Sequence, residues 1–170
     1  MWKRLVWFLA AVPLTIPAST SAQATTDAPP FTADEIAIYR DFLLHYPGPL
    51  SQISGMQDTT VTFTASRGFG DDPNQLNLQI PTYRGRQLPP EVMALAKEKA
   101  VTAGITARLP DGSVKWRFTL SEIAFDSKHE KAAFIFDALC GCKGGQGGTI
   151  LYELKDGQWK RKRMLNDWIS

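Results

Sequence analysis

Histidine and cysteine are scarce in this sequence, and their scarcity limits the chemistry that the chain can carry. Its 170 residues include two histidines, His45 and His129, and two cysteines, Cys140 and Cys142. A serine-hydrolase triad needs a histidine beside a nucleophile, and neither histidine has that context. A zinc site needs about four ligands, and His129 lies at the far end of the predicted strand that ends in Cys140, roughly 30 Å away. We therefore expect no metal, no cofactor and no hydrolase centre.

An excess of either charge is also missing. The chain has 19 Lys and Arg against 17 Asp and Glu, and this small surplus disappears if Lys3 and Arg4 leave with an N-terminal leader. A protein that binds nucleic acid is expected to show a strong basic excess, because it must neutralise phosphates. The sequence therefore predicts no nucleic-acid partner.

No hydrophobic run is long enough to cross a bilayer. The apolar run from Leu5 to about Leu14 is half of the roughly 20 residues that a spanning helix needs. Lys3 and Arg4 precede it, and a stretch of small residues ending in Ala22-Gln23-Ala24 follows it, which is typical of a secretory signal peptide. We expect residues 1–24 to be that signal, and the mature protein to be soluble, without a stable membrane anchor, and exported to the periplasm or the extracellular space.

What remains has the composition of an ordinary globular domain, with 44% hydrophobic and 21% charged residues. A short linker, residues 25–31, leads into a single domain over residues 32–170. Thr32 and Glu35 have the spacing of a capping box, and apolar residues at helical spacing follow, so we predict a helix over about 33–45, with His45 at its C-terminal end as a capping or solvated group. Pro89-Pro90 predicts the start of a second helix.

Strand patterns dominate the C-terminal half. In "VKWRFTLSEIAF", from Val114, strict alternation puts Phe118 and Leu120 on one face and Ile123 on the other, so we predict a bulge near Ser121-Glu122. "KAAFIFDALC" is apolar on both faces and therefore central. "TILYELKDGQWKRKRML" contains Asp156-Gly157, a strong hairpin signal. The fold class expected is α+β, an antiparallel meander of three to five strands packed on one or two helices; "TTVTFTAS" (residues 59–66) and "LNLQIP" (residues 76–81) are further predicted strands.

The C-terminal third resembles small exported bacterial proteins of unassigned function. The resemblance rests on an apolar strand that runs into the Cys/Gly turn Cys140-Gly141-Cys142, on the hairpin motif Asp156-Gly157-Gln158-Trp159, and on the closing Trp168-Ile169-Ser170. These motifs are structural. The arrangement is also similar to cystatin-like and NTF2-like folds, some of which hold a pocket, and this likeness implies an architecture and no reaction.

The segment "ALCGCKGGQGGT" (residues 138–149) allows several interpretations. A phosphate loop is disfavoured, because Lys143 precedes most of the glycines and a strand follows them. In an oxidising compartment Cys140 and Cys142 can form a disulfide across a turn that bends at Gly141. They can also act as a redox pair, or remain as thiols that cross-link chains. Asp71-Asp72 resembles a calcium-binding carboxylate pair, but the spacing favours an exposed turn.

The run "QWKRKRML" places cations on both faces of a predicted strand. By strict alternation Lys160 and Lys162 share one face and Arg161 and Arg163 the other. Such charges protect an edge strand from pairing with other chains, and Arg161 and Arg163 can also contact a ligand or an acidic partner. The function expected is an exported, non-catalytic domain that binds a small molecule or an envelope or extracellular protein. The alternative is a thiol–disulfide exchange protein that uses Cys140 and Cys142.

Overall fold

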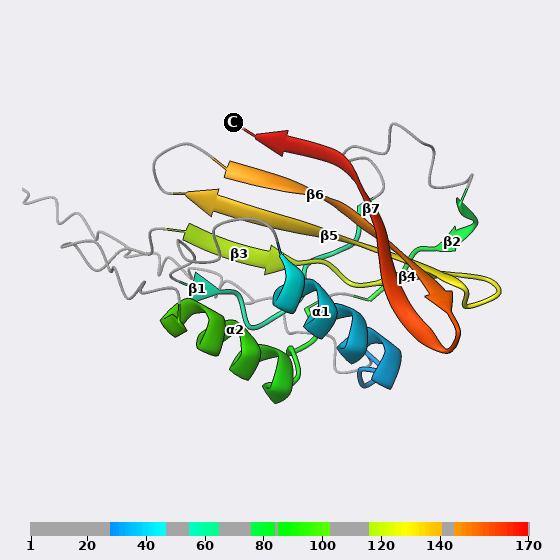
Figure 1. Cartoon of the computed structure of the whole chain (residues 1–170), viewed down its shortest axis with the longest axis horizontal. Helices are drawn as coiled ribbons and strands as arrows, with labels where there is room; N and C mark the ends of the chain where they lie inside the picture. The colour runs from blue at the N-terminus through cyan, green and yellow to red at the C-terminus, as the bar shows by residue number, and fades with distance from the viewer. Residues whose placement is uncertain are drawn as a thin grey trace, which may run out of the picture.

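Two helices pack on one face of a β-sheet, so the fold has two layers (Figure 1). The computed structural model describes residues 28–46, 55–64, 76–83, 85–102, 116–140 and 145–169. Within these residues the sheet has seven strands, of which the last five are long enough to form most of it. The α+β fold class predicted from the sequence is confirmed.

Helix α1 (Ala33–His45) has the predicted bounds, and its first turn shows why. The Thr32 hydroxyl accepts a hydrogen bond from the Glu35 N–H at 3.2 Å, and the Glu35 carboxylate accepts one from the Thr32 N–H at 2.7 Å. This capping box satisfies two backbone donors that the first turn of a helix leaves unpaired. Helix α2 (Pro90–Thr102) begins with Pro90 at its first position, where the missing N–H costs nothing. Neither helix, nor any other helix in the described part of the chain, is long and apolar enough to cross a membrane.

The sheet is built on a central strand, as the sequence predicted. Strand β5 pairs antiparallel with β6 along one edge and with both β3 and β4 along the other, and β7 pairs with β6. Two short strands complete the sheet, β1 parallel to β3 and β2 antiparallel to β4. The bounds are β1 (Gly55–Met56), β2 (Leu78–Gln79), β3 (Trp116–Leu120), β4 (Ala124–Asp126), β5 (Lys131–Cys140), β6 (Gly145–Lys155) and β7 (Gln158–Ile169).

The predicted strand over residues 59–66 is wrong. Thr59 and Val61 form only isolated bridges, to Gln87 and Ser121, and residues 65 and 66 lie outside the described part of the chain. The segment instead contributes Phe63 to the smaller core cluster, on the face of the sheet opposite the helices. The short strand expected within residues 76–81 is present as β2.

The predicted bulge separates β3 from β4. The Ser121 N–H donates to the Ile135 carbonyl at 2.8 Å, and the Ile135 N–H donates to the Ser121 hydroxyl at 2.8 Å, so the extra residues remain attached to β5. The bulge restores the phase of the apolar residues: Ile123 lies in the same core as Phe118 and Leu120. The interruption that looked like a change of face therefore keeps these side chains on one face.

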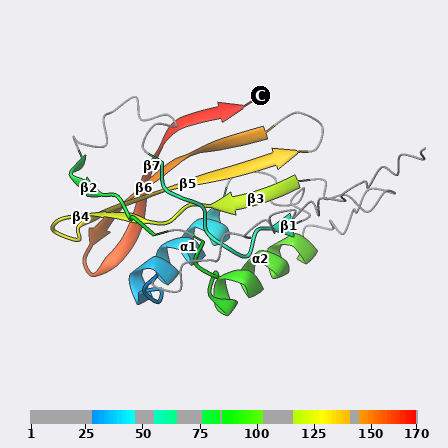
Figure 2. The same cartoon turned by 180° about the vertical axis from the view of Figure 1, so that it is seen from behind.

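Each face of the sheet has its own core. Under the helices, aromatic rings pack edge to face, for example Tyr39 on Phe134 with centroids 5.4 Å apart and Phe42 on Phe134 at 5.0 Å. On the opposite face, the segment after β1 crosses the sheet, as Figure 2 shows from behind. A smaller cluster lies on that face, and its buried members are Phe63, Ala124, Ala133, Ile135 and Leu151. Strand β5 is buried on both sides, which explains its continuous apolar sequence.

The hairpin between β6 and β7 turns at Asp156 and Gly157. Both have positive φ, 52° and 73°, and the flanking residues Lys155 and Gln158 are paired. Two central residues with positive φ define the type I′ turn that Asp-Gly favours. The predicted hairpin is confirmed, and it returns β7 along β6 toward the end of α1.

Candidate functional site

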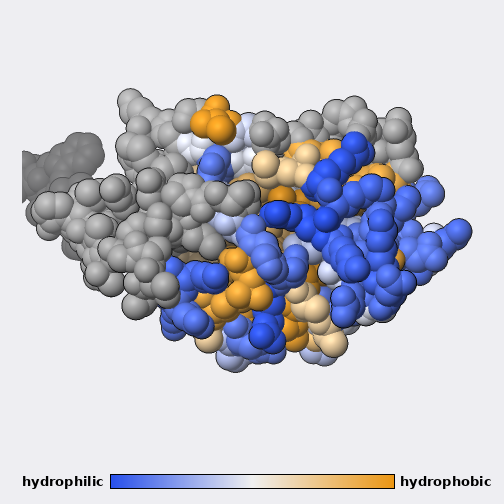
Figure 3. Space-filling view, viewed as in Figure 1, coloured by the Kyte–Doolittle hydropathy of each residue, from blue (hydrophilic) through white to orange (hydrophobic). Residues whose placement is uncertain are grey.

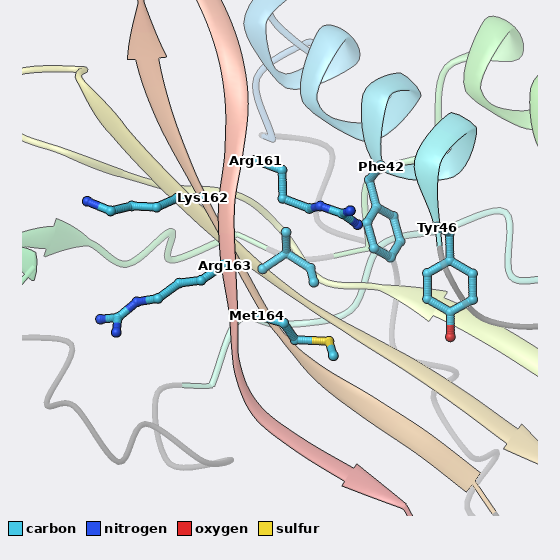
Figure 4. A pocket seen from close by; sticks show the side chains of 7 residues that line it. Phe42, Tyr46, Arg161, Lys162, Arg163 and Met164 are labelled. Carbon is cyan, nitrogen blue, oxygen red and sulfur yellow. The ribbon is translucent and has the colours of Figure 1, made fainter.

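A pocket opens between the C-terminal end of α1 and the first half of β7 (Figure 4). Its volume is about 260 Å³, and it is lined by Phe42, Tyr46, Ile150, Arg161, Lys162, Arg163 and Met164. A cavity of about 150 Å³ accommodates benzene, so this pocket has room for roughly ten non-hydrogen atoms. It is the candidate ligand site in the described part of the chain.

A second bulge, in β7, decides which side chains enter the pocket. Arg161 pairs with Tyr152 and Arg163 pairs with Leu151, so Lys162 is an extra residue between them. Arg161 and Met164 therefore point toward α1, while Lys162 and Arg163 point away from it, as Figure 4 shows. The expectation that Arg161 and Arg163 share a face is wrong, because strict alternation stops at the bulge.

Apolar groups form the floor and the α1 wall of the pocket. Ile150 and Phe42 are fully buried, with exposed fractions of 1% and 0%, whereas Met164 is 42% exposed at the rim. Figure 3 shows hydrophilic residues gathered over β7, with hydrophobic surface beside them. The pocket thus combines an apolar floor with a cationic side.

The polar atoms at the pocket are donors. Arg161 is exposed, and its Nη1 donates to the His45 carbonyl at 3.4 Å. The Tyr46 hydroxyl accepts a hydrogen bond from Gln146 Nε2, which leaves its own proton to donate. Burial raises the pKa of Tyr46 to about 12, so the phenol is neutral at physiological pH. Arg161 and Tyr46 can both donate to an acceptor on a ligand.

The nearest carboxylate already has partners. Asp41 Oδ2 accepts a hydrogen bond from the Tyr152 hydroxyl at 2.8 Å, and Asp41 Oδ1 lies 3.0 Å from His45 Nδ1. On the outer face of β7, Lys162 pairs with Glu153, whose pKa the hydrogen bond from Lys162 lowers. These pairs leave Arg161 as the cation aimed into the pocket.

A second group of polar residues, the buried ion network, is Glu35, Arg86 and Glu122. Arg86 Nη2 donates to Glu35 at 2.5 Å and also to Glu122, and Arg86 Nε donates to Glu122 at 2.8 Å. Their exposed fractions are 3%, 6% and 0%. The network joins α1, the segment before α2 and the bulge after β3.

This network has no capacity left for a ligand. The remaining Arg86 donor, Nη1, reaches the Pro29 carbonyl at 3.3 Å and Glu35 Oε2 at 3.4 Å, so all five N–H groups have acceptors. The ring of Phe31 covers the guanidinium, 3.8 Å from its carbon. Although burial alone would lower it, the hydrogen bonds to Glu122 and Glu35 raise the pKa of Arg86 above its usual range. The network therefore stabilises the fold.

Both histidines have structural partners. His45 Nδ1 lies 3.0 Å from the Asp41 carbonyl oxygen as well as from its carboxylate, consistent with the expected role at the helix end. His129 stacks on Phe125 with centroids 4.2 Å apart and pairs with Asp34 at 2.8 Å. Among the described residues, no three His, Cys, Asp or Glu side chains come together as metal ligands.

The cysteine pair lies largely outside the described part of the chain. Cys140 ends β5, but its side chain lies outside the described part, as do Cys142 and Asp71-Asp72. A disulfide, a redox pair or cross-linking thiols at Cys140 and Cys142 all stay predictions.

Two of the glycines after Cys142 have a structural reason. Gly145 and Gly147 lie within β6, and a Cβ at Gly147 would come within 2.6 Å of both Asp137 Oδ1 and Trp168 Nε1. Only glycine lets these two side chains cross the strand so closely.

Sequence reasoning found two of the residues that line the pocket, Arg161 and Arg163, and missed the rest. Arg161 was a candidate, but the contribution of Phe42, Ile150 and Met164 depends on how β7 bends back over α1. The sequence contains one sign of the buried ion network, because Glu122 interrupts an apolar strand pattern. Arg86 lies in a segment without any hydrophobic periodicity, so nothing marks it as buried.

Comparison with protein-family models, with curated proteins and with solved structures finds no match for this chain.

Proposed function

We propose that this protein is an exported, non-catalytic binding domain, and that a small molecule binds in the pocket between α1 and β7. The observation that carries the proposal is the pocket itself: a hollow of about 260 Å³ with an apolar floor and two lining residues that carry donors, Arg161 and Tyr46. Ligand sites are concave, mostly apolar and equipped with a few placed polar groups. The volume lies just below the range for drug-sized ligands, which favours a small compound.

The residues at the pocket support binding rather than catalysis. Asp41 and His45, which pair with each other, do not line the pocket, so neither is placed as an acid or base toward a ligand there. Tyr46 is a neutral donor with its pKa raised by burial to about 12. Export is part of the proposal because residues 1–24 have the pattern of a signal peptide. A protein partner would need about 800 Å² of contact on each side, far more than this hollow offers.

The test uses residues 25–170 and three probes of the right size that share one apolar body: 3-phenylpropanoate, 3-phenylpropanamide and 3-phenylpropylamine. We expect at least one probe to raise the thermal midpoint, because a ligand that binds only the native state stabilises it. NMR shift changes should centre on Phe42, Tyr46 and Met164. Met164→Trp fills the rim of the pocket and should abolish binding.

Ile169→Trp is the matched control, because Ile169 lies on the same strand, is 83% exposed and does not line the pocket. This variant should bind the probes as the unmodified protein does. Binding that Met164→Trp leaves unchanged, or no pocket shifts with any of the three probes, would contradict the proposal.

A further inference from the structure

Arg161 defines which kind of small molecule the pocket can select. Its side chain comes from β7 and points toward Phe42 and Tyr46, as Figure 4 shows. A guanidinium has five N–H donors, and in the described part of the chain Arg161 has one bond, to the His45 carbonyl at 3.4 Å. Most of its donors are therefore available to a ligand.

We propose that the ligand is a monocarboxylate with a short apolar body, and this inference rests on the proposed function of the same pocket. The planar donor fork of arginine matches the two oxygens of a carboxylate. The Tyr46 hydroxyl, whose acceptor side is occupied by Gln146, adds a neutral donor at the α1 wall. The apolar body then packs on Met164, which is 42% exposed at the rim, above the floor that Ile150 and Phe42 form.

The charge balance of the site limits the ligand to one negative charge. Although Lys162 and Arg163 are among the lining residues, their side chains extend to the other side of β7, away from Phe42 and Tyr46, and Lys162 pairs with Glu153 there. Asp41 accepts a hydrogen bond from the Tyr152 hydroxyl at 2.8 Å. One cation therefore faces the ligand with a carboxylate nearby, so a dianion such as a phosphate ester would keep an uncompensated charge. A cationic ligand would be repelled by Arg161.

The bulge in β7 creates this selectivity. If β7 were regular, with Lys162 paired and no bulge, Arg163 would point to the same side as Arg161, and Met164 would leave the rim that it now forms beside Arg161. The bulge places a cation and an apolar side chain on the same side of the strand within three positions. The carboxylate group of an amphipathic ligand then faces Arg161, and its apolar body faces Met164.

The test compares dissociation constants of 3-phenylpropanoate, 3-phenylpropanamide, 3-phenylpropylamine and phenyl phosphate, measured by calorimetry at one ionic strength. We expect the carboxylate to bind about fivefold tighter than the amide. This ratio corresponds to about 1 kcal/mol, the upper end of what an exposed ion pair contributes. The amine and the phosphate ester should bind more weakly than the carboxylate. Arg161→Gln should bring the carboxylate-to-amide ratio close to one.

Lys160→Gln is the matched control: it removes the same charge one residue along β7, from an exposed side chain that does not line the pocket. It should keep the preference for the carboxylate. If all probes bind the pocket with equal affinity, the proposed function stands and the carboxylate inference is wrong. If no probe binds, both are wrong. An equal loss of preference in the two variants would mean that the net charge of the domain, rather than Arg161, attracts the anion.

Discussion

At the residue scale, two glycines carry different constraints. Gly157 has a φ of 73°, and no atom lies within 4 Å of the position where a Cβ would be built. Its requirement is purely conformational, because residues with a side chain rarely adopt this backbone region. Gly147 has the opposite constraint, since a Cβ there would collide with Asp137 and Trp168. The sequence pattern marks the first glycine as a turn residue, and only the packing explains the second.

Replacing Gly157 by valine should lower the free energy of unfolding by about 1 kcal/mol or more, because a β-branched residue is strained at positive φ. Gly157→Asn is the control, since asparagine tolerates this region better and should cost less. Urea denaturation midpoints measure both. Equal stability of the valine variant and the unmodified protein would show that the turn does not hold this conformation in solution.

At the element scale, two bulges place the side chains that matter most. The bulge between β3 and β4 turns Glu122 into the interior, where Arg86 and Thr60 bond its carboxylate. The bulge in β7 directs Arg161 into the pocket and Lys162 away from it. An irregular position in a strand is often where a functional side chain is re-aimed, and here one bulge builds the core while the other builds the candidate site.

Arg86→Met should destabilise the protein by about 3 to 5 kcal/mol, because it leaves the carboxylates of Glu35 and Glu122 buried without their cation. Adding Glu35→Gln and Glu122→Leu to that variant should recover much of the loss, since Gln keeps the capping box and Leu removes the buried charge. Arg117→Met, on the exposed side of β3, is the control and should change stability little.

Chemical denaturation of the four proteins provides the comparison. If the single Arg86→Met variant were as stable as Arg117→Met, the buried ion network would not hold the helix layer on the sheet.

At the scale of the whole molecule, folding buries part or all of every tyrosine ring of the chain. All four tyrosines have a raised pKa: burial dominates for Tyr39, Tyr46 and Tyr83, and burial with the hydrogen bond to Asp41 raises that of Tyr152. The neutral phenol is the form that the folded state favours. This stabilisation is fully present below the pKa of an unfolded tyrosine, about 10, and is lost as the pH rises through the folded values.

Stability should therefore fall as the pH rises from about 10 toward the Tyr46 value of about 12, because the unfolded state releases protons that the folded state retains. Tyrosinate absorbance during an alkaline titration, recorded with unfolding by circular dichroism, measures this. Tyr46→Phe should make the decline less steep. Ionisation of all four tyrosines near pH 10 in protein that is still folded would contradict the burial described here.

The local patterns of the sequence were sufficient for the two helices and the long strands, but not for β1 or for the segment over residues 59–66. The capping box at Thr32 determines where α1 begins, the apolar run of β5 predicts its central position, and Asp156-Gly157 predicts the hairpin. These features depend on neighbours close in the chain, whose preferences act before any tertiary contact forms. The predicted bulge at Ser121-Glu122 belongs with them, because a change of phase is visible in the sequence itself.

The site depended on contacts between distant segments. Arg86 stands about 50 residues from Glu35 and about 36 from Glu122, and no local signal indicates which carboxylates it meets. The phase of β7 beyond Lys162 follows from its pairing with β6, so the sequence alone placed Arg161 and Arg163 on one face while the register separates them. A bulge in a strand of charged residues leaves no hydrophobic pattern to reveal it, and a pocket exists only once α1 lies beside β7; both were decided by the tertiary structure.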